Sequence, residues 1–174
     1  MGGLCFQVMH RCKPGRANNN TFHIARDMLL CAMRIVFDTS VMVAALRSRH
    51  GASRLWLAST LRGEHTALVS VPLVLEYEAV LTRPEHLEPS GLTTEQVGLL
   101  LDGLCSVAVH VDIAYLWRPQ LRDPDDEMVL EAAALGRADL LLTFNVRDFS
   151  GAERFGVRAV RPGPAWTGNF GEAI

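Results

Sequence analysis

Apolar and polar stretches alternate along the chain in a way that predicts strands and helices in turn. The run at residues 34–38 is short, branched and apolar, as expected for a strand buried on both faces. Four similar runs predict further strands at residues 66–71, 107–111, 140–144 and 156–162. Because strands that alternate with helices usually form parallel pairs, the pattern predicts an α/β fold with a mainly parallel central sheet and helices on both faces.

Capping residues and helix breakers indicate where the first helices begin and end. Ser40 is expected to cap a helix that begins at Val41, and Gly51 is expected to break it. Pro72 is expected at the first position of the next long helix, where its missing N–H costs nothing. That helix should run to about Thr82, since Pro84 forbids its continuation.

Two later helices carry stronger start signals. Thr93 and Gln96 have the spacing of a capping box and predict a helix over residues 93–106. Asp123 has the character of an N-cap and Pro124 that of a first helical residue, and this helix should end at Gly136.

The composition is that of a globular protein and excludes several other classes. Of 174 residues, 49% are hydrophobic and 21% are charged, and no apolar run approaches the roughly 20 residues that span a bilayer. The formal net charge of −2 gives no overall attraction for nucleic acid, so any such contact must come from local patches. The four cysteines show no C-x-x-C spacing, which argues against zinc or disulfides and leads us to expect a reducing, cytoplasmic compartment.

The first 32 residues differ from the rest of the chain. The segment "KPGRANNNTF" is polar and turn-forming, and no long apolar region follows its basic residues, so it is a poor signal peptide. Two interpretations stay open: residues 1–32 form a flexible N-terminal extension, or the functional protein begins at Met33. We expect one domain over residues 33–165 and a C-terminal tail over residues 166–174.

Oxygen-bearing side chains follow or face the ends of several predicted strands. Asp38 closes the first strand, Glu76 lies one turn into the helix after the second, and Asp126 lies at the start of the helix before the fourth. Asn145 and Asp148 follow the fourth strand directly. Ligands of open parallel sheets bind beyond the carboxyl ends of the strands, and Mg²⁺ or Mn²⁺ prefers oxygen ligands. A carboxylate cluster without a cation would repel itself, so the pattern favours a divalent metal site.

Each acid also has an ordinary structural interpretation. Asp125 lies in a first helical turn, where the helix dipole favours acids, and this explanation is the stronger one for that residue. For Asp126 both interpretations stay open. Glu76 shares a helix face with apolar Leu73 and Tyr77, which is unusual for a plain surface acid and favours a function. Thr143 fits an ordinary strand position as well as a site.

Four segments in order resemble the PIN-domain family and, within it, the toxins of bacterial toxin–antitoxin systems, which are VapC-like ribonucleases. They are "RIVFDTSVMVAAL", "SVPLVLEYEAVL", "RDPDDEMVLEAA" and "ADLLLTFNVRDFSG", and they span residues 33 to about 160. The resemblance implies a PIN-like three-layer fold and a Mg²⁺- or Mn²⁺-dependent endoribonuclease with an RNA substrate. It also implies a cognate antitoxin as partner and frequent homodimers.

Carried over by position, the resemblance assigns roles to particular residues. The metal-binding and catalytic acids fall on Asp38, Glu76 and Asp126, and the supporting positions on Thr39, Ser40, Thr143 and Asn145. The fourth segment of the family normally has Asp two residues after Thr, where this chain has neutral Asn145, and Asp148 would supply the missing charge if the loop turns back. Arg47, Arg49 and Arg147 are candidate RNA phosphate contacts, with ordinary solvated arginines as the alternative.

Two other functions compete with the ribonuclease. Asn145 leaves room for an inactive PIN domain whose role is to bind another protein. A phosphatase of the haloacid dehalogenase type also places Asp at a strand end, but it needs a second Asp where Ser40 stands. It also needs a phosphate-binding Lys, and the chain has no Lys after Lys13.

Overall fold

The computed structural model describes residues 32–113 and 124–169, which form a central five-stranded sheet. Its strands are β1 (Arg34–Phe37), β2 (Thr66–Val69), β3 (Val109–His110), β4 (Leu140–Leu142) and β5 (Arg158–Val160). They lie in the order β3-β2-β1-β4-β5, and every neighbouring pair is parallel. All five predicted strands are therefore present, each shorter than expected.

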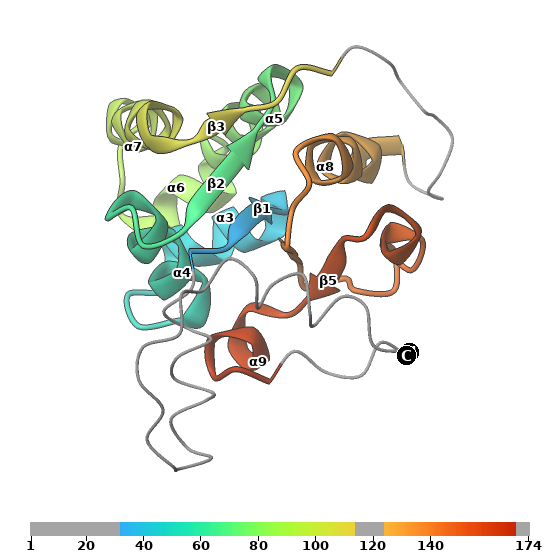
Figure 1. Ribbon diagram of the computed structural model, residues 1–174. Helices are drawn as coiled ribbons and strands as arrows, with labels where there is room; N and C mark the ends of the chain where they lie inside the picture. Colours follow the sequence, from blue (N-terminus) through green and yellow to red (C-terminus); the bar gives the residue numbers. More distant parts are fainter. Residues whose placement is uncertain (1–31, 114–123, 170–174) are drawn as a thin grey trace.

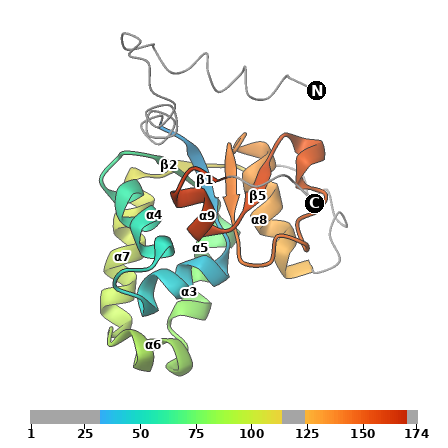
Figure 2. The ribbon, with the colours of Figure 1, turned by 90° about the horizontal axis from the view of Figure 1, so that it is seen from below.

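Helices cover both faces of this sheet. They are α3 (Thr39–Arg47), α4 (Ala52–Leu61), α5 (Val71–Leu81), α6 (Pro84–Ser90), α7 (Thr94–Val107), α8 (Pro124–Leu135) and α9 (Pro162–Trp166), with a short 3₁₀ helix η1 (Ala152–Phe155). Helix α8 packs against β1, β2 and β4 on one side, and α4 with α9 lies on the other (Figure 1; Figure 2). The predicted three-layer α/β fold is confirmed.

The strand order creates a switch point beside β1. From β1 the chain moves outward through β2 to β3, and it then returns to the other side of β1 for β4 and β5. The crossovers from β1 and from β4 therefore leave in opposite directions. In open parallel sheets, ligands bind outside the carboxyl ends of the strands at such a point. Here that point lies between the ends of β1 and β4.

The three strands around the switch point end level with one another. The register pairs Phe37 with Leu142, and Leu142 with Val160. The residues that follow these strand ends, Asp38, Thr143 and Arg161, therefore lie in one row across the edge of the sheet.

Burial of the central strands and of a tryptophan on α4 holds the layers together. Ile35, Val36 and Phe37 are at most 1% exposed, as the apolar run predicted. Trp56 is fully buried, and its indole N–H donates to the carbonyl of Pro162 at 3.0 Å, which ties α4 to α9. Full burial of such side chains stabilises the fold by roughly 1.5–3 kcal/mol each.

The helices on either side of the switch point begin at residues other than those predicted. Helix α3 begins at Thr39 with Asp38 as its N-cap residue, so the predicted cap at Ser40 is wrong. Helix α5 begins at Val71 because the Ser70 hydroxyl accepts from a backbone N–H of the first turn, and Pro72 is thereby the second helical residue. Both helices start immediately beyond a strand, so their first turns lie at the ligand edge.

Other differences lie farther from that edge. Pro84 stops α5 as expected, but it also opens the additional helix α6. The expected extension up to residue 31, the expected cap Asp123 and the last five residues of the expected tail lie outside the described residues. Within the described part of the chain, no helix is both long and apolar enough to cross a membrane.

Candidate active site

Asp38 is fixed between the sheet and the first helix. Its side chain and backbone together are only 6% exposed. Its amide donates to the Leu142 carbonyl of β4 at 2.9 Å, and its own carbonyl accepts from the Val41 amide of α3 at 2.9 Å. The backbone at this residue is therefore held from both sides, which sets the direction in which the carboxylate leaves the chain.

Two hydroxyl groups hold the Asp38 carboxylate. Ser40 Oγ donates to Oδ2 at 2.6 Å, and Thr143 Oγ1 donates to the same oxygen at 2.7 Å. Short bonds of this kind to a charged acceptor are strong and directional. Because both donors use Oδ2, the second oxygen, Oδ1, has no hydrogen-bond donor among the described residues. Thr39 starts α3 beside this pair but makes no side-chain hydrogen bond to Asp38 within the same part of the chain.

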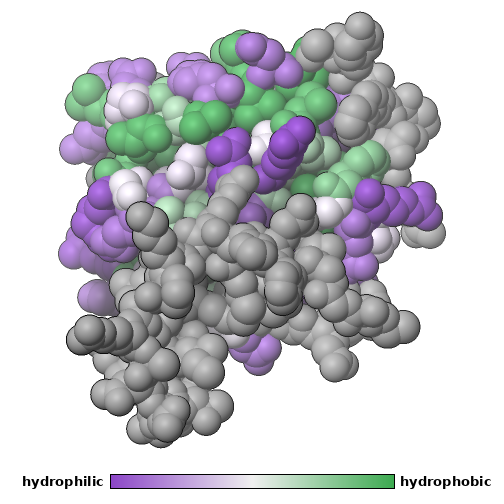
Figure 3. All heavy atoms as spheres, viewed as in Figure 1, coloured by the Kyte–Doolittle hydropathy of each residue, from purple (hydrophilic) through white to green (hydrophobic). Residues whose placement is uncertain are grey.

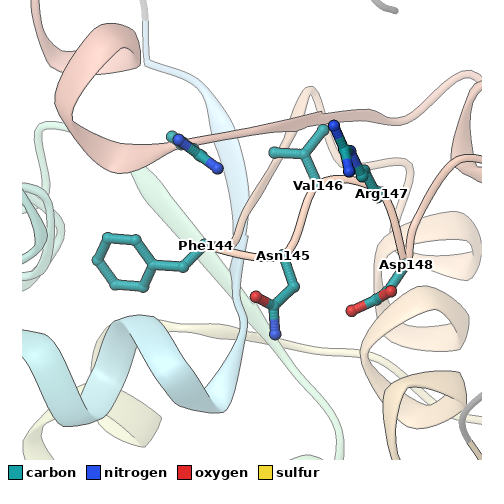
Figure 4. Close-up of a pocket in the computed structure, with 6 residues that line it drawn as sticks. Phe144, Asn145, Val146, Arg147 and Asp148 are labelled. Atoms are coloured by element: carbon teal, nitrogen blue, oxygen red, sulfur yellow. The ribbon is translucent and has the colours of Figure 1, made fainter.

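The loop after β4 is organised around Thr143. Thr143 is fully buried, and its hydroxyl oxygen accepts from the Asn145 amide at 2.9 Å while it donates to Asp38. The Asp148 amide donates to the Asn145 carbonyl at 3.0 Å, so the loop closes a turn. In Figure 4 the side chains of Asn145 and Asp148 leave the loop on the same side, and Asp148 points back toward Asn145. The two polar side chains therefore share one side of this loop.

Helix α5 is anchored next to Asp38 by a buried tyrosine, which the sequence pattern placed only on an apolar helix face. The Tyr77 hydroxyl donates to the carbonyl of Phe37, the last residue of β1. Burial raises the pKa of Tyr77 well above its usual value, and the nearby charge of Asp38 and then that of Cys105 raise it further. Glu76, the neighbour of Tyr77, is half-buried, so it lies at the margin of the packed face.

Asp126 lies in the first turn of α8 and is half-buried. Since α8 leads back to the start of β4, its first turn lies toward the carboxyl edge of the parallel sheet. Two further acids of this helix, Glu127 and Glu131, are buried at 2% and 3% exposure. Neither acid was predicted as a site residue, although both lie on one face of an apolar helix, four residues apart. The side chain of Asp125 lies outside the described residues.

The described side chains do not form a closed metal cage. Over residues 32–113 and 124–169, no three Asp, Glu, His or Cys side chains gather closely enough to hold an ion. Hydrogen bonds connect the Asp38 carboxylate to the hydroxyls of Ser40 and Thr143. The Thr143 hydroxyl in turn accepts from the backbone N–H of Asn145. Glu76 lies on α5 and Asp126 on α8, and both helices begin at the carboxyl edge of the sheet.

The predicted arginines separate into two groups. Arg147 lines a hollow of about 420 Å³ together with Phe144, Asn145, Val146, Asp148 and Arg161. Arg47 ends α3, roughly 12 Å along the helix from Thr39, and Arg49 lies beyond it. Neither residue lines the hollow. Arg161 was not predicted as a site residue, because residues 156–162 were expected to form one strand, whereas β5 ends at Val160.

Comparison with known proteins bears on the same segments. The family model described as "PIN domain" matches residues 34–147, which include β1, the switch point and the loop after β4. Searches of curated proteins and of solved structures gave no match. PIN domains are generally metal-dependent nucleases that act on RNA and typically use divalent metals. The match covers well over half of the chain, and the parallel three-layer fold agrees with it, so this chain belongs to the PIN-domain family.

Proposed function

We propose that the chain is a Mg²⁺- or Mn²⁺-dependent endoribonuclease and serves as the toxin of a type II toxin–antitoxin pair. The observation that carries the proposal is the Asp38 carboxylate at the switch point. It is nearly buried, and two hydroxyls hold one of its oxygens while the other has no donor among the described residues. A carboxylate held in this way is suited to a ligand that approaches from the open edge of the sheet.

The donor set suits a hard divalent cation. Mg²⁺ typically takes one or two protein carboxylates and fills its remaining positions with water and phosphate oxygens. Asp38 would provide the central ligand, with Glu76 and Asp126 from the adjoining helices. A bound cation would supply positive charge at the phosphodiester and lower the pKa of water. Without a cation such carboxylates would repel one another, so a bound cation would be needed to hold them close together.

The residues around Asp38 would act by position and by proton transfer. Ser40 and Thr143 keep the carboxylate in one orientation, and the Asn145 amide keeps the Thr143 hydroxyl in place. Asp148 supplies the negative charge that Asn145 lacks, from the same side of the loop (Figure 4). Its carboxylate is exposed and would accept a proton from the attacking water.

Cleavage of RNA by the purified chain tests the proposal. We expect cleavage with Mg²⁺ or Mn²⁺, loss of cleavage in EDTA, and a drop of roughly 100-fold or more in Asp38→Asn, because charge stabilisation at the phosphate depends on that carboxylate. The matched control is Asp102→Asn, which removes an exposed acid from α7 and should leave the rate unchanged. An Asp38→Asn protein that cuts RNA as fast as the unmodified chain would refute the assignment.

An exposed apolar surface supports a protein partner. Hydrophobic side chains gather over α5, α7 and β3 (Figure 3), and the exposed ones include Val71, Leu75, Leu99, Val107 and Val109. Val71 and Leu75 lie on the helix that carries Glu76. An antitoxin with an apolar helix would cover this surface. A basic side chain of the antitoxin would then reach the carboxylates of Asp38, Glu76 and Asp126. A homodimer through the same surface is the other expected assembly.

Growth of a bacterial host tests the toxin role. Expression of the chain should arrest growth, Asp38→Asn should not, and co-expression of the protein encoded next to it should restore growth by binding the chain. Arrest that persists in Asp38→Asn would contradict a ribonuclease toxin.

A PIN domain that binds a partner without catalysis is the second candidate, because Asn145 is neutral where the family has an acid. Asn145→Asp separates the two. If the unmodified chain hardly cleaves RNA and Asn145→Asp cleaves it much faster, the chain is an enzyme that has lost its activity. Strong cleavage by the unmodified chain would exclude an inactive PIN domain.

A further inference from the structure

The hollow at the loop after β4 combines an aromatic side chain, two arginines, an asparagine and an aspartate. Its walls are the loop residues Phe144 to Asp148 and Arg161, the residue after β5. Phe144 is 41% exposed, and among the large exposed hydrophobic side chains of the described residues it is the aromatic one. An isolated exposed Phe is ordinary by itself. Here, however, Phe144 lines the same hollow, called the cavity below, as the exposed side chains of Arg147 and Arg161.

The two arginines are available for a ligand. Arg147 and Arg161 are both exposed, and within residues 32–113 and 124–169 the ion pair that the structure shows joins two other residues, Arg62 and Glu64. In Figure 4, Arg147 leaves the loop on the side opposite Asn145 and Asp148. The cavity therefore presents positive charge on one side and an amide and a carboxylate on the other.

The sheet register fixes how far this cavity lies from Asp38. Asp38, Thr143 and Arg161 follow three adjacent strands that end level. Neighbouring strands are about 4.8 Å apart, so the backbone of Arg161 lies roughly 10 Å from that of Asp38. Thr143 bridges the gap, since its side chain contacts Asp38 and its own successor is Phe144. A nucleotide next to a phosphodiester at Asp38 would reach the cavity.

We propose that this cavity binds one unpaired RNA nucleotide adjacent to the cleaved bond. The base stacks on Phe144, and Arg161 with Arg147 contacts its phosphate. A base inside a duplex is already stacked on its neighbours, whereas an unpaired base offers a free face to an aromatic ring. The cavity therefore selects single-stranded segments of RNA. The placement next to the cleaved bond rests on the proposed ribonuclease function, but the stacking and phosphate contacts do not.

Binding measured without cleavage tests the subsite. The full chain carrying Asp38→Asn, in EDTA, is titrated against a short fluorescein-labelled single-stranded oligoribonucleotide of mixed sequence and against the same strand annealed to its complement. Adding Phe144→Ala should weaken single-strand binding roughly 5- to 100-fold, the usual effect of losing one base–aromatic stack. Phe144→Trp should restore binding, Phe144→Leu should not, and duplex binding should be the same in all three.

The phosphate contact has its own readout. Arg161→Gln should weaken single-strand binding and reduce the slope of log affinity against log salt by about 0.7, the value for one phosphate contact on a single strand. Arg154→Gln is the matched control, because Arg154 is also exposed but precedes β5 instead of following it. Leu55→Ala serves the same purpose for Phe144, since Leu55 is an exposed hydrophobic residue on α4, outside the hollow and outside the apolar surface over α5, α7 and β3.

The outcomes distinguish failure of the nucleotide subsite from failure of the proposed ribonuclease function. Unchanged single-strand affinity in Phe144→Ala, or no RNA binding at all, overturns the subsite, even if the unmodified chain cleaves RNA. Phe144-dependent binding by a chain that never cleaves RNA supports the subsite and refutes the ribonuclease. An unchanged salt slope in Arg161→Gln overturns the phosphate contact.

Discussion

At the scale of single residues, the candidate site is organised by one oxygen of the Asp38 carboxylate, which accepts two hydrogen bonds. Ser40 and Thr143 both donate to Oδ2 of Asp38, and Thr143 in turn accepts from the Asn145 amide. The Thr143 hydroxyl therefore links the Asp38 carboxylate to the loop that carries Asn145 and Asp148. We expect Thr143 to position these groups, because it is fully buried and its hydroxyl donates to Oδ2 of Asp38.

Thr143→Val tests this positioning role. Valine has nearly the same shape but lacks the hydroxyl, so Asp38 loses one of its two donors and the Asn145 amide loses its acceptor. We expect kcat for RNA cleavage to fall roughly 10- to 100-fold with little change in KM, because orientation is lost and substrate contacts are not. Thr143→Ser should retain most of the activity. Kinetics on one RNA substrate check this, and equal kcat values in the Val variant and the unmodified chain would contradict it.

At the scale of elements, the join between α8 and β4 is unusually tight. The Arg34 guanidinium of β1 donates twice to the Gly136 carbonyl, at 2.8 and 3.0 Å. A Cβ atom at Gly136 would lie 2.7 Å from the Ala132 carbonyl oxygen and 2.7 Å from a methyl carbon of Leu68. A residue with a Cβ atom at position 136 would therefore force the end of α8 and β2 apart, and Asp126 lies at the opposite end of this helix.

Gly136→Ala should destabilise the protein, and a matched glycine should behave in the opposite way. The clash with backbone at Ala132 predicts a loss of roughly 1–3 kcal/mol in the free energy of unfolding. At Gly98, inside α7, a Cβ atom would meet no other atom within 4 Å, so Gly98→Ala should stabilise the helix by about 0.5–1 kcal/mol. Urea denaturation of both variants measures the difference. Equal stabilities would show that the chain relaxes around Gly136.

The elements were predictable to different degrees for identifiable reasons. The strand at Arg34 to Phe37 and the capping box at Thr93 are encoded locally, by apolar branching and by side-chain spacing, and both are present. The end of β5 is set by its pairing with β4, a tertiary contact, so Arg161 was hidden inside a predicted strand. Ser40 lost its predicted capping role because its hydroxyl bonds to Asp38 instead.

At the scale of the whole molecule, the parallel topology gathers distant segments at one edge, and the sequence pattern was sufficient to predict that. It was not sufficient to predict that Asp38, Thr143 and Arg161 form a row, because strand register depends on which strands pair. Nor did it show that Tyr77 fastens α5 to the end of β1 across 40 residues of chain.

Tyr77 should give global stability a characteristic dependence on alkaline pH. Its pKa is raised well above 10 in the folded protein, while an unfolded tyrosine ionises near pH 10. Below about pH 10, the contribution of the neutral Tyr77 side chain to the free energy of unfolding is fully present. Above it, the unfolded state loses a proton that the folded state retains, so the free energy of unfolding falls by up to about 1.4 kcal/mol per pH unit.

Tyr77→Phe isolates that contribution. The variant should lose about 1 kcal/mol at neutral pH, with the hydrogen bond to Phe37, and should show a flatter decline above about pH 10. Denaturant titrations at several pH values compare the two proteins. Parallel curves for the variant and the unmodified chain would mean that Tyr77 ionises equally in both states.

The way Asp38 is held has a genetic consequence. Its amide and carbonyl are bonded to Leu142 and Val41, and neither bond involves the carboxylate. Asparagine has nearly the same shape and still offers an oxygen to both hydroxyls, so we expect the fold to tolerate Asp38→Asn. Aspartate and asparagine codons differ by a single base. Under the proposed ribonuclease function, a single base change in the gene would therefore give a folded but inactive protein, and the reverse change would restore activity.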